Sequence, residues 1–219
     1  RLWSSEQYVS EVTLATSEFA NVAIEGELAI SLCKNVEPSD ASIPAIAAAV
    51  DRVFPVIELH NLVLHGECPT GAELIGNNAI HAGVVRSAGT RPPRASACTD
   101  LSVALNGRTV AHWSDRQWPE DILQAVPWLV VELARDERQL MAGQTILTGS
   151  WGPPLPLERQ ASPETPTVSP LGWNNGHANV TPGERQMVSR VNVMSSLFGE
   201  VGASFSAADE IPRKKIQDA

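Results

Sequence analysis

The sequence AIEGELAISL, residues 23–32, places two glutamates, Glu25 and Glu27, inside an otherwise apolar run. Side chains of a β-strand alternate between its two faces, so a strand here puts both carboxylates on one face and Ile24 and Leu28 on the other. Like charges on a half-buried face repel each other unless they reach water or hold a cation between them. The spacing alone therefore leaves two interpretations open, a solvated strand face and a cation site.

The neighbouring segments predict a strand–helix–strand unit. Residues 21–33 form its first strand, and NVEPSDASIP at 35–44 supplies turn and capping residues. Apolar residues then recur at helical spacing over residues 43–54, which predicts a short amphipathic helix that ends before Pro55. The apolar run VIEL at 56–59 resumes as a strand.

The remaining chain predicts further strands and one longer helix. Asn-Gly between two apolar runs is a strong hairpin signal, and proline favours the first turn of a helix. The expected elements are an irregular segment at 60–79, a hairpin over 101–110 around Asn106–Gly107, a helix opened by Pro119 and kinked or divided by Pro127, a turn and short buried strand over 142–150, and a terminal hairpin over 185–206 around Gly199–Glu200.

The length of 219 residues indicates one domain, residues 1–219, with a core of its own. Proline, glycine, serine and threonine become dense from residue 151 to 182. We interpret residues 155–180 as an insertion loop within the domain, and we predict that it forms a lid or a subunit contact through Trp173 and His177.

Composition excludes several classes of protein. A net charge of −9 and a pI near 5.0 argue against a nucleic-acid-binding surface. No apolar run is long enough to cross a bilayer, and the first residues lack the pattern of a secretory signal. Cys33, Cys68 and Cys98 show no C-x-x-C spacing, so we expect small buried or half-buried thiols in a reducing compartment, the cytoplasm.

The glutamates can converge with a third carboxylate. Glu58 lies on the strand predicted to follow that of Glu25 and Glu27, and three carboxylates with open positions suit Mg²⁺ or Mn²⁺. His60 lies two residues beyond Glu58 and faces the same way if the strand continues. It is a candidate fourth ligand or catalytic base, and a purely structural histidine remains the alternative.

Six segments occur in order along the chain: AIEGELAISL, VFPVIEL, GNNAIHAG, PWLVVELA, AGQTILTGSWGP and FGEVGASFS. Together they resemble the fumarylacetoacetate hydrolase superfamily, most closely its branch of 2-keto-4-pentenoate hydratases and 4-oxalocrotonate decarboxylases. The resemblance covers nearly the whole chain outside 155–180. It implies an α/β (α+β) domain, a mixed β-roll of the superfamily's C-terminal-domain type with a few outer helices. It also implies that Glu25, Glu27 and Glu58 are the metal ligands.

The resemblance implies a divalent-metal-dependent lyase, a hydratase or decarboxylase that acts on a small 2-oxo or 2-hydroxydienoic acid through a metal-stabilised enolate. One scaffold serves several reactions, so an acylpyruvate-type carbon–carbon hydrolase and a diverged member without the ancestral chemistry remain alternatives. Related proteins self-associate, which implies a homodimer or larger homo-oligomer. No nucleic-acid or membrane partner is expected.

The resemblance also implies further site residues and departures. Asn77 replaces an acid of related hydratases, and Ile80 or His81 replaces a small hydroxyl residue, so the substrate pocket is expected to differ. The candidate residues are Asn77, Asn78, Thr148, Gly149 and Ser150 for substrate binding, and His60 and His81 for catalysis.

Two more departures concern the approach to the long helix and a lysine. SDRQWP at 114–119 replaces a glycine-rich segment, keeps only its proline and adds the bulk of Trp118. In the related hydratases a lysine thought to transfer protons precedes the E-x-E strand, and the sequence is expected to lack that segment. Lys34, the nearest lysine, is expected to face solvent.

Overall fold

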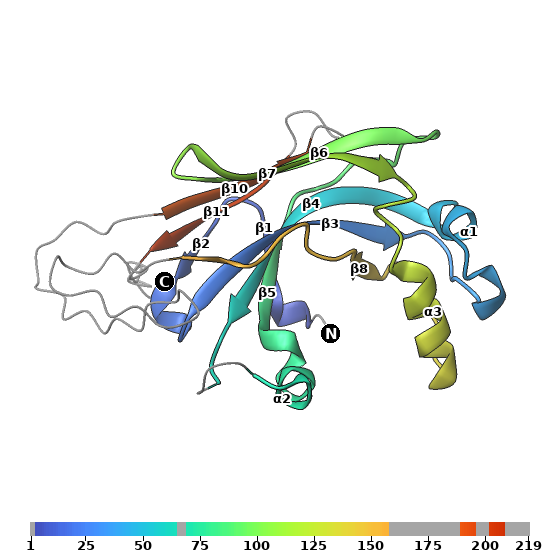
Figure 1. Cartoon of the computed structure of the whole chain (residues 1–219), viewed down its shortest axis with the longest axis horizontal. Coiled ribbons are helices and arrows are strands. Elements are labelled where there is room, and N and C mark those ends of the chain that lie inside the picture. Colours follow the sequence, from blue (N-terminus) through green and yellow to red (C-terminus); the bar gives the residue numbers. More distant parts are fainter. Residues whose placement is uncertain (1–2, 65–68, 158–188, 196–201, 209–219) are drawn as a thin grey trace, which may run out of the picture.

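The computed structural model describes residues 3–64, 69–157, 189–195 and 202–208, which form two β-sheets (Figure 1). The first sheet has the strand order β1-β5-β4-β3-β8, and β9 also pairs with β3. Its strands are β1 (Gln7–Val9), β3 (Val22–Leu32), β4 (Val50–Asn61), β5 (His81–Arg86), β8 (Thr145–Leu147) and β9 (Leu155–Pro156).

The second sheet has the order β2-β11-β10-β6-β7. Its strands are β2 (Val12–Ala15), β6 (Ala97–Leu105), β7 (Arg108–Trp118), β10 (Ser189–Ser195) and β11 (Gly202–Ala208). The pairs β1–β5 and β2–β11 are parallel and the other pairs are antiparallel. The described helices are α1 (Ile43–Ala47), α2 (Gly71–Gly76) and α3 (Val126–Arg135), with short 3-10 turns at Ser4–Glu6, Thr16–Glu18, Pro38–Asp40 and Asn78–Ile80. Mixed sheets with few helices confirm the predicted α+β class.

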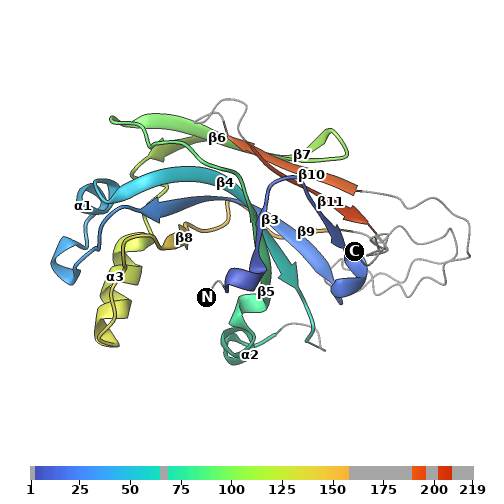
Figure 2. The same ribbon diagram turned by 180° about the vertical axis from the view of Figure 1, so that it is seen from behind.

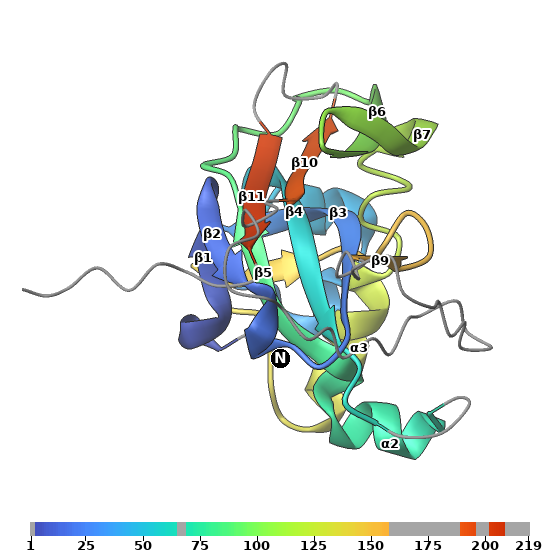
Figure 3. The same ribbon diagram turned by 90° about the vertical axis from the view of Figure 1, so that its left-hand side faces the viewer.

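The main core lies between the two sheets. Figures 2 and 3 show the strands of the second sheet lying across β3 and β4. Alternation on β3 turns Ile24, Leu28 and Ile30 to this interface, where all three are almost fully buried. Leu101 and Val191 meet them from the second sheet. Each such side chain contributes about 1.5–3 kcal/mol of burial free energy, so this layer fixes the face on which Glu25 and Glu27 do not lie.

The N-terminal segment links the two sheets. β1 belongs to the first sheet and β2 to the second. At the crossing, the Ser10 N–H donates to the Arg86 carbonyl and the Glu11 N–H donates to the Ser204 carbonyl. The chain therefore passes within a few residues from the edge strand of one sheet to the edge strand of the other.

The helix predicted over residues 43–54 is wrong beyond its first turns. α1 ends at Ala47, and β4 begins at Val50, so the chain forms an antiparallel pair with β3. Both faces of β4 are buried around Phe54, and a strand buried on both faces has no alternation to separate it from a helix. Pro55 fits inside β4 because the ladder with β5 begins only at Val56.

The helix predicted to open at Pro119 is also wrong. β7 continues to Trp118, and α3 begins only at Val126. Pro127 lies in the first turn of α3, where a missing N–H costs nothing, so this proline starts the helix and neither kinks nor divides it.

The segment at 60–79 is more regular than predicted. β4 continues to Asn61 and α2 covers Gly71–Gly76. The Thr70 hydroxyl accepts from the Glu73 N–H, and the Glu73 carboxylate accepts from the Thr70 N–H. This capping box is visible in the sequence as T-x-x-E and starts the helix.

Several other predictions are confirmed. β6 and β7 meet at Asn106–Gly107, whose φ angles of 52° and 80° are those a tight hairpin needs. β8 is the predicted short strand, and Lys34 is exposed. β10 and β11 form the predicted antiparallel pair, while their connection at Gly199–Glu200 lies outside the described residues.

The predicted insertion and the thiols have mixed outcomes. Leu155–Pro156 is strand β9, whereas residues 158–180, with Trp173 and His177, lie outside the described residues. Cys33 and Cys98 are exposed, so the expectation of buried thiols is wrong for both, and Cys68 is not described. Among the described helices, none is long and apolar enough to cross a membrane.

Candidate metal and substrate site

The register of β3 and β4 brings the predicted carboxylates together. Glu25 lies directly opposite Glu58, Glu27 opposite Val56, and His60 opposite Ala23. Residues that pair directly share a face, so Glu25, Glu27, Glu58 and His60 all lie on the face turned away from the core between the sheets. The sequence-predicted face is therefore the one the structure shows.

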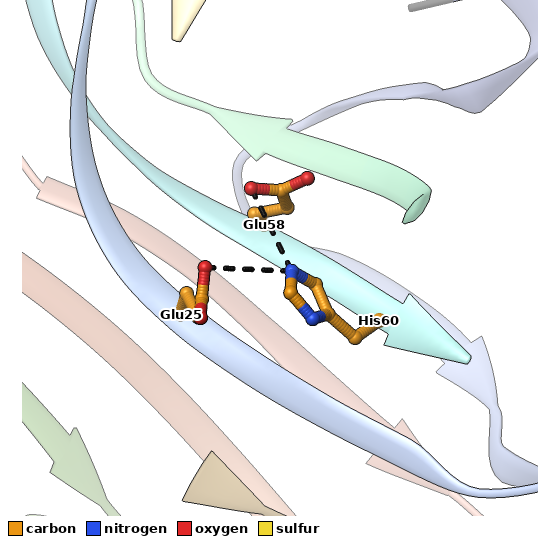
Figure 4. A group of neighbouring side chains, drawn as sticks. All are labelled: Glu25, Glu58 and His60. Atoms are coloured by element: carbon orange, nitrogen blue, oxygen red, sulfur yellow. Dashed lines mark ion pairs between the residues drawn. The ribbon is translucent and has the colours of Figure 1, made fainter. Parts of the chain in front are cut away.

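Three of these side chains meet around one point. Glu25, Glu58 and His60 each offer a ligand atom, and these atoms lie within 4.8 Å of one another. His60 Nε2 is 3.4 Å from Glu25 Oε2 and 3.7 Å from Glu58 Oε2 (Figure 4). All three side chains are at most 15% exposed, so their charges interact through a low-dielectric medium.

Glu27 lies beside this cluster and is only 3% exposed. The backbone N–H of Gly149 donates to its carboxylate. Its Oε2 atom is buried and has no hydrogen-bond partner among the described residues. An unpaired buried carboxylate oxygen is costly, so its position next to the other carboxylates indicates a place for a cation or a proton.

The site contains more acidic groups than its positive charges can balance, and this imbalance shifts the pKa values of its side chains. Burial raises the pKa of Glu27, and the charges of Glu58 and Glu25 raise it further, to about 9. Burial alone raises the pKa of Glu58, but contacts with His60 and His81 lower it to about 2. Burial lowers the pKa of His60, yet its contacts with Glu25 and Glu58 raise it to about 9. The protonated imidazole therefore occupies the position of a cation between two carboxylates.

His81 is joined to the same cluster from β5. Its Nδ1 atom lies 2.6 Å from Glu58 Oε1, and its Nε2 atom lies 3.9 Å from Glu6 Oε2. No sequence pattern pointed to Glu6, because only the pairing of β1 with β5 brings the N-terminal segment to His81.

The residues before His81 have unusual backbone conformations. Asn78, Ala79 and Ile80 have φ angles of 49°, 57° and 58°, a left-handed run that costs energy at a β-branched residue. Asn77 ends α2, and its Nδ2 atom is buried without a hydrogen-bond partner among the described residues. The two predicted amides thus lie four and three residues before His81 in the chain, and their contact with a substrate stays a prediction.

Thr148, Gly149 and Ser150 lie at the end of β8, next to Glu27. Both the N–H and the hydroxyl of Thr148 donate to the Leu28 carbonyl, which fixes this turn on β3. Gly149 has a φ angle of 108°, in the region that favours glycine, and this conformation lets its N–H reach Glu27. The structure therefore brings the predicted substrate-binding block to the predicted metal ligands.

A cavity of about 230 Å³ opens at this block. Its lining residues are Arg116, Asp121, Ile122, Gln124, Ala125, Thr148, Gly149, Ser150 and Trp151. Sequence reasoning missed Arg116 and Asp121 as lining residues, because β7 and the turn after it reach this place only through the packing of the second sheet on the first. Trp151 was also missed, although it directly follows Ser150 in the sequence.

An apolar patch continues the same face of the first sheet beyond Glu27. It consists of Ala29, Phe54, Val56 and Val84, with Leu147 packed against them. These side chains carry no polar atoms, so they restrict water on one side of the carboxylates and strengthen the electrostatic interactions there.

The donor set fits a divalent cation. Three carboxylates and one imidazole are oxygen and nitrogen ligands of the kind that Mg²⁺ and Mn²⁺ accept, with nitrogen favouring Mn²⁺. The unpaired Glu27 oxygen and the mutual repulsion of the acids are both relieved by such an ion. Glu25, Glu58 and His60 are placed to bind it directly, and Glu27 is the adjacent fourth donor.

Comparisons with known proteins agree on the fold. No family model matches the sequence. A 4-oxalocrotonate decarboxylase from Pseudomonas putida G7, complexed with magnesium and adipate, has a TM-score of 0.67 and 15% identity over 93% of this chain and 66% of its own. A fumarylpyruvate hydrolase from Pseudomonas aeruginosa, in complex with Mn²⁺ and pyruvate, has a TM-score of 0.57 and 14% identity over 93% of this chain and 74% of its own.

A fumarylacetoacetate hydrolase family protein from Yersinia pestis CO92 has a TM-score of 0.57 and 15% identity, over 94% of this chain and 80% of its own. This chain thus spans slightly less than two thirds of the decarboxylase and more of the other two. At such low identity the likeness establishes the arrangement of strands and helices. The chain has the fold of the fumarylacetoacetate hydrolase superfamily.

Proposed function

We propose that the protein is a divalent-metal-dependent enzyme that acts on a small 2-oxo or 2-hydroxydienoic acid, and that its reaction is that of a lyase, either hydration or decarboxylation. The observation that carries the proposal is the meeting of Glu25, Glu58 and His60 within 4.8 Å, beside a buried Glu27 oxygen that has no partner among the described residues. Neighbours in fold that were solved with magnesium or manganese support it.

The protein's own residues have separate tasks in this proposal. Glu25, Glu58 and His60 hold the cation, and Glu27 is the adjacent fourth donor. When bound, a Mg²⁺ or Mn²⁺ ion would attract the carboxylate and 2-oxo oxygens of the acid and withdraw electrons from the conjugated chain. His81, fixed through Nδ1 on Glu58, orients that carboxylate. The apolar patch around Phe54 and Val84 excludes water from the carbon chain.

Product analysis tests the proposal. The protein is incubated with Mn²⁺ and a panel of 2-oxo and 2-hydroxydienoic acids, and the products are identified by mass spectrometry. Hydration retains every carbon, and decarboxylation releases carbon dioxide. We expect turnover that falls at least about a hundredfold in Glu25→Gln and Glu58→Gln, because each change removes a charged ligand. Glu132→Gln, on the outer part of α3, is the matched control.

The second candidate is carbon–carbon hydrolysis of an acylpyruvate, favoured by the likeness to a fumarylpyruvate hydrolase. It is recognised by the release of a second carboxylic acid. Binding of these acids without any product would favour a diverged member that keeps the site but not the chemistry. Turnover that is unaffected in both glutamine variants would contradict a metal-centred enzyme.

Two further expectations belong to this proposal. We propose a homodimer or larger homo-oligomer, to be checked by sedimentation equilibrium on the full chain, where a mass near 23.5 kDa would contradict it. We also propose a cytoplasmic location, because the three cysteines show no C-x-x-C spacing, which favours a reducing compartment.

A further inference from the structure

The cavity beside the carboxylate cluster contains a cationic group that the proposed function does not use. Gly149 belongs to both features, because it lines the cavity and its N–H donates to Glu27. An acid held at the cluster through one end therefore has the cavity as adjacent space for its other end. At about 230 Å³ the cavity suits a chain of a few carbons.

Most polar groups at the mouth of the cavity already have partners. The Thr148 hydroxyl donates to the Leu28 carbonyl, the Ser150 hydroxyl donates to the Gly152 carbonyl, and the Gly149 N–H is taken by Glu27. Arg116 differs from them. Within the described part of the chain, its guanidinium forms no ion pair and no hydrogen bond to a side chain or carbonyl.

An aromatic ring holds this guanidinium in place. Arg116 Cζ lies 5.3 Å from the centroid of the Trp151 ring, and Trp151 is itself only 8% exposed. A guanidinium in contact with an indole gains cation–π energy through its face, while the N–H groups in its plane stay available. Those N–H groups can bind both oxygens of a carboxylate at once.

Asp121 reduces the positive charge of the cavity. Its carboxylate accepts the Gln117 N–H at 2.7 Å, so the turn after β7 holds it in position, and it lies beyond ion-pair distance from Arg116 within the described residues. An anion therefore gains binding free energy in the cavity only by contacting Arg116 directly. Removing the Asp121 charge should consequently strengthen the binding of an anion.

We infer that Arg116, seated on Trp151, binds a second carboxylate at the far end of the substrate, so that the preferred substrates are dicarboxylic 2-oxo acids. This inference rests on the proposed function, which supplies the binding of the first carboxylate. Arg116 is then the residue that sets specificity between mono- and dicarboxylic acids. The step involves binding alone, with no bond made or broken.

A matched pair of saturated acids tests it by calorimetry in saturating Mn²⁺. 2-Oxoadipate and 2-oxohexanoate share the 2-oxo acid end and the six-carbon chain, and they differ in the terminal carboxylate. We expect the wild type to bind 2-oxoadipate about ten- to a hundredfold more tightly, as a charged hydrogen-bonded pair contributes that much. Arg116→Met should remove the preference and leave 2-oxohexanoate affinity within about twofold.

Three more variants sharpen the test. Arg116→Lys should retain part of the preference, and Asp121→Asn should increase it. Arg135→Met, an exposed arginine on α3, should leave it unchanged. Unaltered Mn²⁺ affinity in Arg116→Met shows that this variant is folded.

Equal binding of both acids by the wild type, or an intact preference in Arg116→Met, would overturn the inference and leave the proposed function standing. If Mn²⁺ binds but neither acid does, the proposed function fails and the inference falls with it.

Discussion

At the scale of single residues, the positive charge of the site lies on the imidazole of His60, between the carboxylates of Glu25 and Glu58. His60 and Glu27 both have pKa values raised to about 9, and Glu58 has a pKa lowered to about 2. A raised pKa in the folded protein contributes stability that is complete below the ordinary value and is lost as the pH rises toward the folded value. A lowered pKa contributes stability that is lost as the pH falls.

These shifts predict how the stability of the metal-free protein depends on pH. The contribution of Glu27 declines from its ordinary value of 4.5 to about 9, and that of His60 declines from 6.5 to about 9. The contribution of Glu58 is lost between 4.5 and about 2. We expect the urea midpoint, measured in a chelator, to be highest near pH 5 and to fall toward pH 9. Glu27→Gln should flatten that fall, and a midpoint that rises from pH 6 to 9 would contradict the pKa assignments.

Residue-level reasoning could predict the carboxylates and His60 but not their surroundings. Glu25, Glu27 and the pair Glu58 and His60 follow from the period of two along a strand, which needs only local sequence. Glu6 and Arg116 reach the site through pairing and packing between segments far apart in the chain, and no local pattern encodes such contacts.

At the scale of elements, the end of β8 couples the cavity to β3. Thr148 is tied to Leu28 and Gly149 to Glu27, so the backbone conformation of Gly149 places an N–H on a buried acid. Residues with a Cβ rarely adopt the φ angle of 108° seen at Gly149, although a Cβ there would meet no atom within 4 Å.

Gly149→Ala should therefore destabilise the protein through backbone strain alone, by about 1–3 kcal/mol. Gly76→Ala is the matched control, since a Cβ at Gly76 also meets no atom within 4 Å but its φ is not positive. That change should be neutral or stabilising by up to about 1 kcal/mol. Urea denaturation measures both, and equal effects would show that the conformation of Gly149 is not strained.

The elements show which local signals can be trusted. β3 and the hairpin at Asn106–Gly107 were predictable because alternation and a turn sequence act locally. β4 was mistaken for a helix in its first half because burial on both faces removes the alternation. The start of α3 was misplaced because Pro119 and Pro127 are both compatible with a first turn, and only the length of β7 decides between them.

At the scale of the whole molecule, the packing of two sheets leaves one face of β3 and β4 for chemistry. The core fills the other face, so binding at the carboxylates stabilises β3 and β4, the strand pair that also supplies side chains to the core. The mixed β-roll was predictable from six short motifs taken together, whereas the crossing of β1 into β2 and the parallel β2–β11 pair were not, since parallel pairing joins distant segments.

This linkage predicts that Mn²⁺ raises the stability of the folded protein. A ligand that binds the native state at one hundred times its dissociation constant adds about 2.7 kcal/mol. We expect the thermal midpoint to rise with Mn²⁺ concentration in the wild type and in Glu132→Gln, and to stay constant in Glu25→Gln. An equal rise in Glu25→Gln would locate the bound ion elsewhere on the molecule.

The decisive measurement is a calorimetric titration of the metal-free protein with Mn²⁺ at pH 7.5, repeated in two buffers of different ionisation enthalpy. The site geometry predicts one ion per chain, with release of protons because Glu27 and His60 are protonated beforehand. Binding should disappear in both Glu25→Gln and Glu58→Gln. Absence of binding in the wild type, or undiminished binding in these variants, would contradict a metal centre on β3 and β4.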